Sequence, residues 1–332
     1  SPVRSPKQAP MPSPRGALAR LLGLALLQRA AAQAAPYGRP MRHAHQHSAT
    51  ADRPPIIRHD HDGTPPCVDK SQSQWHEEDD VLEFFGAWRD KTDGAYVEIG
   101  ALDGVQFSNT LKLASCQGWR GVLVEGLLAN FRKLEQNLAL RPAVTAFWGA
   151  VCAPPRDTVK FVGSDADSDT DAVGADLEHM SPEFMAKFHK DDAHTRVSVP
   201  CQPMGTYLEG LTHVDFFSLD VEGAEFRILE TIDFTVLTVD VFVIEMMYYD
   251  LEHNWLIREF LRNIGYVECT GVVERSGLFV RKAALDDLKL TRPCEPYTDI
   301  QFMPAIDKSW NNRQAVEAIR KKYGLPAPEP RR

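Results

Sequence analysis

Several common patterns are missing from this sequence of 332 residues, and each absence narrows the class of protein. No Gly-x-Gly-x-x-Gly run is present, so the turn that binds a dinucleotide pyrophosphate is missing. No apolar run is long enough to span a bilayer comfortably. No two cysteines have the Cys-x-x-Cys spacing of a zinc or redox site. These absences disfavour a nicotinamide-dependent oxidoreductase and a close-spaced zinc site.

Acidic residues are absent from residues 1–51, which carry seven cations. They are Arg4, Lys7, Arg15, Arg20, Arg29, Arg39 and Arg42. Because the whole chain has a net charge of −9, the remaining residues carry −16. An acidic body repels phosphate backbones, so nucleic acid is disfavoured as a partner.

The N-terminal region contains a short apolar run at 21–27, preceded by Arg15 and Arg20 and followed by small residues at 30–35. This order is typical of a secretory signal peptide or signal anchor. An organelle transit peptide, or a plain tail without structure, fits the same composition. We favour the secretory pathway and place the organelle second.

Six cysteines are present, and no Asn-x-Ser/Thr sequon accompanies them. They are Cys67, Cys116, Cys152, Cys201, Cys269 and Cys294. An even number fits disulfides in a secretory lumen. Buried free thiols fit equally well, and we expect these by a small margin.

The chain divides into three regions by composition. Residues 1–74 are rich in proline and lack hydrophobic periodicity, and their histidine cluster reads as part of a solvated linker, with no metal site. Residues 75–285 alternate short apolar strands with amphipathic helices, interrupted by an acidic insertion at about 153–213. Residues 286–332 form a tail with one weak helix at 312–323.

The alternation predicts a parallel sheet with helices on both faces. Strands are expected at 95–99, 121–124, 144–151, 215–219 and 239–244, with a closing hairpin at 266–273 and 278–281. Helices are expected from 77, and at 108–116, 130–140, 223–232 and 254–264, with Ser108 or Asn109 and Asn254 as N-caps. Within the insertion, 159–162 and 197–201 read as strands and 182–189 as a helix.

Polar or glycine residues follow four of the expected strands, namely Gly100, Glu125, Asp220 and Glu245. Ligands bind such sheets beyond the carboxyl ends of the strands. Gly100 permits close backbone approach to a ligand, and Glu125 offers a carboxylate for ribose hydroxyls. Asp220 and Glu222 crowd a strand-to-helix turn, where at least one pKa should be perturbed.

Four segments together resemble the FkbM-type methyltransferase family in its eukaryotic-looking branch. They are YVEIGALDGVQFSNTLKL (96–113), GWRGVLVEG (118–126), VDFFSLDVEGAEFRIL (214–229) and VFVIE (241–245), and 265–282 resembles the closing hairpin. The resemblance implies a Rossmann-like seven-stranded methyltransferase sheet with a terminal antiparallel hairpin. It also implies S-adenosylmethionine as the methyl donor and O-methylation of a saccharide or other small polar acceptor.

The resemblance also implies roles for particular residues. The methionine part of the donor would lie against Glu98, Gly100, Ala101, Asp103 and Gly104, with Ser108 and Asn109 beneath the same pocket. Glu125 would bind the ribose, and Asp220, Glu222 and Glu225 would line the site near the methyl group. Gly126 stands where the family usually has proline, and the adenine contact stays unassigned.

Methyl transfer to a hydroxyl needs a base, for which Asp220 is the first candidate, Glu222 or Glu245 the next, and His253 an outside choice. No metal ligand is assigned, although the acids could instead hold Mg²⁺ or Ca²⁺. A non-catalytic donor-binding or scaffold module in a secretory or membrane route is the alternative function. The oligomeric state and the acceptor's identity do not follow from the sequence.

Overall fold

The computed structural model describes residues 56–60, 66–141, 143–163, 172–189, 195–247 and 250–297, all within one compact unit, Thr50–Trp310. The signal-like run at 21–27, the histidine cluster and the weak helix at 312–323 lie outside the described residues. Within the described part of the chain, no helix is long and apolar enough to cross a membrane.

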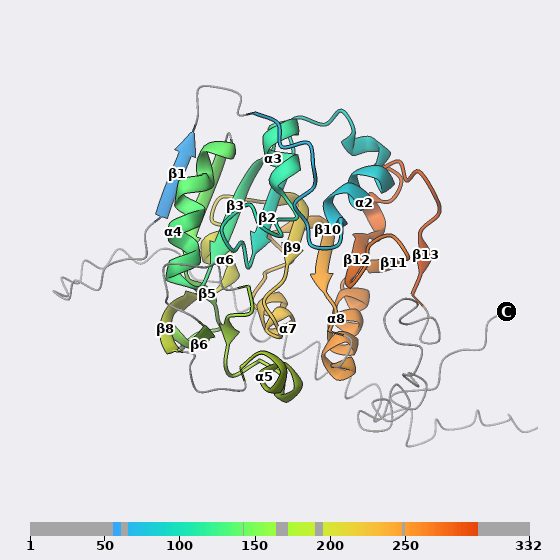
Figure 1. Cartoon of the computed structure of the whole chain (residues 1–332). Helices are drawn as coiled ribbons and strands as arrows, with labels where there is room; N and C mark the ends of the chain where they lie inside the picture. Colours follow the sequence, from blue (N-terminus) through green and yellow to red (C-terminus); the bar gives the residue numbers. More distant parts are fainter. Residues whose placement is uncertain are drawn as a thin grey trace, which may run out of the picture. The chain divides into compact units, whose positions relative to one another are not determined.

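A nine-stranded sheet forms the centre of the unit (Figure 1), in the order β1-β4-β3-β2-β9-β10-β12-β11-β13. These strands are β1 (Ile56–Asp60), β4 (Ala143–Trp148), β3 (Arg120–Glu125), β2 (Ala95–Ile99), β9 (His213–Leu219), β10 (Thr238–Glu245), β12 (Ser276–Arg281), β11 (Tyr266–Thr270) and β13 (Glu295–Pro296). The predicted count of seven is therefore corrected to nine, because β1 and β13 pair at the two edges.

Strands β4, β3, β2, β9 and β10 are parallel, whereas β12 and β11 run antiparallel to their neighbours. The chain starts the parallel part at β2, builds outward to β4 and then returns to β9 on the other side of β2. The order of the strands therefore reverses between β2 and β9. At such a switch point the carboxyl ends of the strands open a crevice for a ligand.

Helices cover both faces of this sheet, as predicted (Figure 1). One face packs against α2 (Glu77–Phe84), α3 (Leu111–Gln117) and α4 (Leu128–Asn137). The other packs against α6 (Met204–Tyr207), α7 (Glu225–Leu229) and α8 (Leu251–Asn263). The single-turn 3₁₀ helices η1 (Gly86–Trp88), η2 (Leu138–Leu140) and η3 (Lys282–Ala284) complete this set.

The alternation of side chains along the central strands explains why both faces are covered. Tyr96 and Phe216 belong to one apolar cluster, whereas their neighbours Val97 and Phe217 belong to the other. Each of these four side chains is fully buried. Burying one such side chain stabilises a fold by about 1.5–3 kcal/mol, so both faces need a helical layer.

Four helices begin at other residues than the sequence predicts: α4 begins at Leu128 and not at 130, α7 begins at Glu225 and not at 223, and α3 and α8 differ in their caps as well. Helix α3 begins at Leu111, not at 108, because Ser108 and Asn109 bind Glu98 instead of capping a helix. Helix α8 begins at Leu251 with Asp250 as its cap, accepting a hydrogen bond from the His253 backbone N–H at 2.9 Å. The expected cap, Asn254, is fully buried and donates to the carbonyl of Met247.

The insertion folds into a second sheet of order β5-β8-β6-β7. Its strands are β5 (Ala150–Val151), β8 (Thr195–Gln202), β6 (Thr158–Gly163) and β7 (Ala175–Asp176). The helix α5 (Pro182–Phe188) follows β7 along the chain. Strands at 159–162 and 197–201 and the helix at 182–189 were all expected there. Ser181 caps α5 by accepting from the Phe184 N–H, with Pro182 at the first helical position.

All six cysteines form disulfides, so the expectation of free thiols is wrong. The pairs are Cys67–Cys116, Cys152–Cys201 and Cys269–Cys294. The partners lie 49 residues apart in the first two pairs and 25 apart in the third, so the spacing of the cysteines did not indicate which of them pair. Only the pairing of strands such as β5 with β8 brings the sulfur atoms together.

Ordered structure extends beyond the expected bounds of 75 and 285. Before 75, the Val68 N–H donates to Ser115 Oγ, and Ser73 forms a β-bridge with Phe107. After 285, the Thr291 N–H donates to the carbonyl of Phe84. Both flanking segments therefore pack against the α2–α3 side of the main sheet.

Candidate functional site

A glycine, Gly100, lies where the carboxyl ends of β2 and β9 come close together. Gly100 has φ of +83°, and a Cβ atom at this position would lie 1.9 Å from the carbonyl oxygen of Asp220. The Asp220 N–H in turn donates to the carbonyl of Ile99 at 3.2 Å. Only glycine allows this approach, which places Asp220 directly beside the start of the β2–α3 loop.

Carboxylates hold the β2–α3 loop in its shape. Glu125 Oε2 accepts from the Leu102 N–H at 2.8 Å. Asp103 Oδ1 accepts from the N–H groups of Val105 and Gln106. Leu102 and Phe107 adopt left-handed backbone conformations, with φ of 53° and 61°. A residue with a side chain keeps such a strained conformation only where surrounding contacts hold its backbone in place, and this is often the case at functional sites.

Glu98 lies beneath this loop and is bound by the loop's own residues. Its carboxylate accepts from Ser108 Oγ at 2.9 Å, the Asn109 N–H at 2.7 Å and Thr110 Oγ1 at 2.6 Å. Arg141, fully buried, lies 3.6 Å from the same carboxylate. Glu98 therefore orders the loop, and it also lines the pocket described below.

Arg141, which was not predicted from the sequence, has a guanidinium that joins β2 to the β2–α3 loop. It donates to Tyr96 Oη, Thr110 Oγ1, Ser108 Oγ and the carbonyl of Gly104, each at 2.9 Å. Glu78 lies near this cluster, and burial raises its pKa to about 8. The sequence did offer one indication that Arg141 is buried, because it stands between an apolar helix and a buried strand.

Asn109 is the residue of the loop that is best placed for a ligand. Its Nδ2 donates to Ser218 Oγ at 3.0 Å. Its Oδ1 is buried without a hydrogen-bond partner, although the residue lines the pocket. A buried acceptor without a donor costs free energy, about 1–3 kcal/mol, so a ligand that donates a hydrogen bond here would be favoured.

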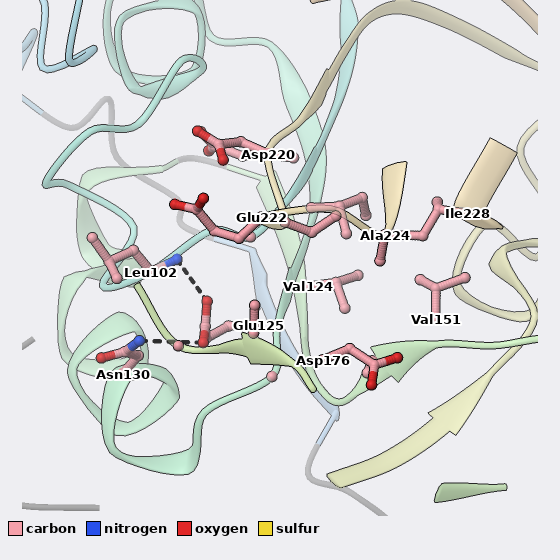
Figure 2. Close-up of a pocket in the computed structure, with 18 of the residues that line it drawn as sticks. Leu102, Val124, Glu125, Asn130, Val151, Asp176, Asp220, Glu222, Ala224 and Ile228 are labelled. Carbon is pink, nitrogen blue, oxygen red and sulfur yellow. Dashed lines mark hydrogen bonds between the residues drawn. The ribbon is translucent and has the colours of Figure 1, made fainter. Parts of the chain in front are cut away.

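Glu125 ends β3, and Figure 2 shows hydrogen bonds reaching its carboxylate from Leu102 and Asn130. Its Oε1 also accepts from the Leu127 N–H at 2.8 Å. The side chain is 6% exposed and lines the pocket. These bonds fix the orientation of the carboxylate at the edge of the pocket.

Asp220, Glu222 and Glu245 bring carboxylate oxygens within 4.8 Å of one another. Asp220 and Glu222 follow β9 and Glu245 ends β10, and Figure 2 shows the first two side by side. Asp220 lines the pocket and is exposed, whereas Glu222 and Glu245 are half-buried. Burial and then the neighbouring negative charges raise the pKa of all three acids, that of Asp220 to about 7. Because the pKa of each of the three acids is raised, the group holds protons near neutral pH.

Glu225 and His253 form a separate pair that supports the turn. Glu225 is fully buried, accepts from the N–H groups of Val221 and Gly223, and lies 2.7 Å from His253 Nε2. Burial would raise the pKa of Glu225, but the hydrogen bond and charge of His253 lower it below the ordinary value. Neither residue lines the pocket, which leaves Glu225 away from its expected place and His253 without access as a base.

These residues surround one pocket at the switch point (Figure 2). Six of the predicted residues line it, namely Glu98, Gly100, Asn109, Glu125, Asp220 and Glu222. Five do not line it, namely Ala101, Asp103, Gly104, Ser108 and Glu245. The lining residues that were not predicted include Leu102, Phe107, Asn130, Phe161 and Asp176. Phe161 and Asp176 come from the inserted sheet. No local sequence pattern predicts where that sheet lies.

Among the residues that the structure describes, two groups of side chains have the composition of a cation site. Asp220, Glu222 and Glu245 offer hard oxygen ligands of the kind that Mg²⁺ or Ca²⁺ prefers. The other group lies at the opposite edge of the sheet, where Asp240 binds Arg281 and His213, and Asp215 binds the Ala95 N–H. Its oxygens are already committed to protein donors, so only the first group faces a ligand pocket.

Comparison with known proteins gives a family for this chain. The family model described as the methyltransferase FkbM domain matches residues 98–268, more than half of the 332 residues. The comparison with curated proteins gave no match.

Two solved methyltransferase structures are also similar to this chain. One is methyltransferase FkbM from Methylobacillus flagellatus KT, with 14% identity and a TM-score of 0.36, covering 60% of this chain and 47% of that one. The chain thus spans about half the length of that protein. The other is precorrin-6y C5,15-methyltransferase from Geobacter metallireducens GS-15, with 14% identity and a TM-score of 0.33, covering 67% and 94%. Similarity this low does not bear on the activity of this chain.

Proposed function

We propose, since the chain belongs to the methyltransferase FkbM domain family, that it uses S-adenosylmethionine to methylate a hydroxyl oxygen. The acceptor class that we propose is a saccharide or another small polar molecule. The observation that carries the proposal is the pocket at the β2–β9 switch point, which is lined both by the fixed carboxylate of Glu125 and by Asn109, whose buried Oδ1 has no hydrogen-bond partner. A nucleoside bearing a cationic amino acid complements those groups.

The donor set of the pocket fits each part of S-adenosylmethionine. Glu125 is placed to accept hydrogen bonds from the two ribose hydroxyls. Asn109 Oδ1 lacks a donor, which the ammonium group of the methionine part would supply. Gly100 lines the same pocket and lets the β2–α3 loop approach Asp220. When bound, the donor supplies a methyl group on a positively charged sulfur, and the acids at the end of β9 suit that charge.

Asp220 is the proposed general base for the acceptor hydroxyl. It lines the pocket, whereas Glu245 does not. A base works best when its pKa is near the operating pH, and that of Asp220 is raised to about 7 by burial. Because a raised carboxyl pKa keeps the proton at lower pH, the basic form of Asp220 increases as the pH rises through this value. The remaining task of the protein is to orient the reactants and to exclude water.

Thermal unfolding of the full chain tests donor binding. A ligand that binds only the folded state raises the melting temperature by mass action. We expect S-adenosylmethionine and S-adenosylhomocysteine to raise it and NAD to leave it unchanged, and Glu125→Ala to remove the shift. Glu209→Ala, an exposed residue outside the pocket, is the matched control and should keep the shift. If a well-folded sample shows no shift with either methionine-derived ligand, the proposed donor is wrong.

Product formation from donor labelled in the methyl group tests catalysis, with a panel of sugars and small polyols as acceptors. We expect Asp220→Asn to reduce turnover by about 10²–10⁴-fold, because general-base catalysis contributes a factor of this size. The same variant should keep the melting shift with S-adenosylhomocysteine. Normal turnover would eliminate Asp220 as the base. Donor binding without turnover of any acceptor would favour a non-catalytic module in a secretory or membrane route.

We also propose that this domain folds in an oxidising compartment, as the secretory pathway provides. Every cysteine is paired, and disulfides form and persist in such compartments but are rare where thiols are kept reduced.

A further inference from the structure

The ends of neighbouring strands set the direction in which a nucleoside donor would lie. In the sheet order β9, β2, β3, β4, the acid Asp220 follows β9, Gly100 follows β2, and Glu125 ends β3. The amino-acid part of the proposed donor lies between β9 and β2, and the ribose lies at β3. The nucleobase must therefore continue past Glu125, toward the end of β4.

The inserted sheet walls this far part of the pocket. After β4 the chain turns at Gly149 into β5, and the pocket lining continues with Val151, Phe161 on β6 and Asp176 on β7. The Phe161 ring lies so close to Gly126 that a Cβ atom there would be 2.2 Å from the ring. Glycine directly after the ribose-binding acid thus makes room for an aromatic ring from the insertion.

Asp176 is the only ionisable side chain that the described part of the inserted sheet places in the pocket lining. It is 8% exposed. Its Oδ1 accepts from the Glu178 N–H at 3.1 Å, and its Oδ2 lies 2.8 Å from His179 Nδ1. These two bonds fix the orientation of the carboxylate, and each of its oxygens has a further lone pair. Figure 2 shows Asp176 across the pocket from Asp220 and Glu222.

We propose that the inserted sheet selects the nucleobase of the donor, with Asp176 accepting a hydrogen bond from the exocyclic amine of adenine and Phe161 covering a face of the ring. The inference rests on the proposed function and assigns the residues that distinguish adenine from other purines. Hypoxanthine carries a carbonyl oxygen in place of the amine. That oxygen would face the carboxylate without a proton between them, so a ligand with this base is rejected.

Calorimetric titration of the full chain with two probes tests the inference. The probes are S-adenosylhomocysteine and S-inosylhomocysteine, which differ only in the amine. We expect the protein to bind the adenosyl probe about tenfold or more tightly, the size of one mispaired buried polar group. In Asp176→Asn the ratio should fall toward one, because the amide can turn its NH₂ toward the carbonyl. Asp157→Asn, an exposed residue of the same insertion, should keep the original ratio.

The ratio of the two affinities is measured within each variant, so a partly unfolded sample does not alter it. If Asp176→Asn does not fold, Asp176→Glu moves the carboxylate by one methylene and should also lower the ratio. Equal binding of the two probes, or an unchanged ratio in the folded variant, overturns the inference and leaves the proposed function standing. Failure of the unaltered protein to bind the adenosyl probe overturns the proposed function, and the inference with it.

Discussion

A buried arginine holds the loop that borders the pocket. The Arg141 side chain is buried away from water. In place of hydrogen bonds to water it donates to Tyr96, Ser108, Thr110 and the Gly104 carbonyl, and it lies beside the carboxylate of Glu98. A buried charge is tolerated only when it is paired and fully hydrogen-bonded. At the scale of single residues, the site therefore depends on a group that does not line the pocket but lies beside Glu98, which does.

Replacing Arg141 with methionine should lower the free energy of unfolding by about 3–5 kcal/mol, because Glu98 would keep a buried charge without its partner. Urea denaturation followed by circular dichroism measures this loss. Arg196→Met, at an exposed position, is the control and should change the free energy of unfolding by less than about 0.5 kcal/mol. A loss for Arg141→Met as small as the control's would show that the network contributes little.

The turn after β9 is stabilised by an ion pair between two helices. Glu225 begins α7, and His253 lies in the first turn of α8. Glu222 in the same turn has a left-handed φ of 59°, a strained conformation for a residue with a side chain. The Glu225–His253 pair thus keeps in place the segment that carries Asp220 and Glu222.

The contribution of this pair to stability depends on pH. The pKa of His253 is raised above 6.5, since the hydrogen bond and charge of Glu225 outweigh the effect of burial. The pKa of Glu225 is lowered below 4.5. A raised histidine pKa stabilises the fold fully below 6.5 and loses this effect as the pH rises through the raised value. A lowered glutamate pKa stabilises it above 4.5 and loses this effect as the pH falls through the lowered value.

His253→Gln should therefore lower the free energy of unfolding most between about pH 4.5 and 6.5 and by less at pH 9. Chemical denaturation of both proteins at pH 5.5 and pH 9 measures the difference. The prediction is contradicted if the loss caused by the substitution is equal at the two pH values or larger at pH 9.

At the scale of the whole molecule, three disulfides attach peripheral segments to the central sheet. Cys67–Cys116 ties the segment before α2 to α3, and Cys269–Cys294 ties β11 to the segment before β13. Cys152–Cys201 closes the inserted sheet where it leaves the main one. One border of the pocket is therefore an inserted sheet whose β5 and β8 ends are covalently joined.

Reduction of the three disulfides should lower the melting temperature markedly, since each crosslink removes conformational freedom from the unfolded chain and contributes about 2–4 kcal/mol. Differential scanning fluorimetry with and without a phosphine reductant measures the shift, and mass spectrometry after alkylation verifies that six thiols were released. Alkylation of unreduced, denatured protein should find none. Free thiols in that sample would contradict the pairing.

The sequence by itself determined those features that depend on neighbours along the chain. Alternating apolar strands and helices predicted the parallel sheet, and acids placed at strand ends predicted Glu125, Asp220 and Glu222 in the pocket. This succeeded because parallel strands carry their carboxyl ends to one edge, so a position at the end of a strand is also a position in space.

Only the tertiary structure decided which distant residues meet. It paired the cysteines, added β1 and β13 to the sheet edges, and placed Arg141 beneath the loop. It assigned Ser108 and Asn109 to Glu98 instead of a helix cap, and it brought Phe161 and Asp176 to the pocket. These outcomes depend on the packing of segments far apart in the chain, where many partners satisfy the same local pattern and only the complete fold selects one.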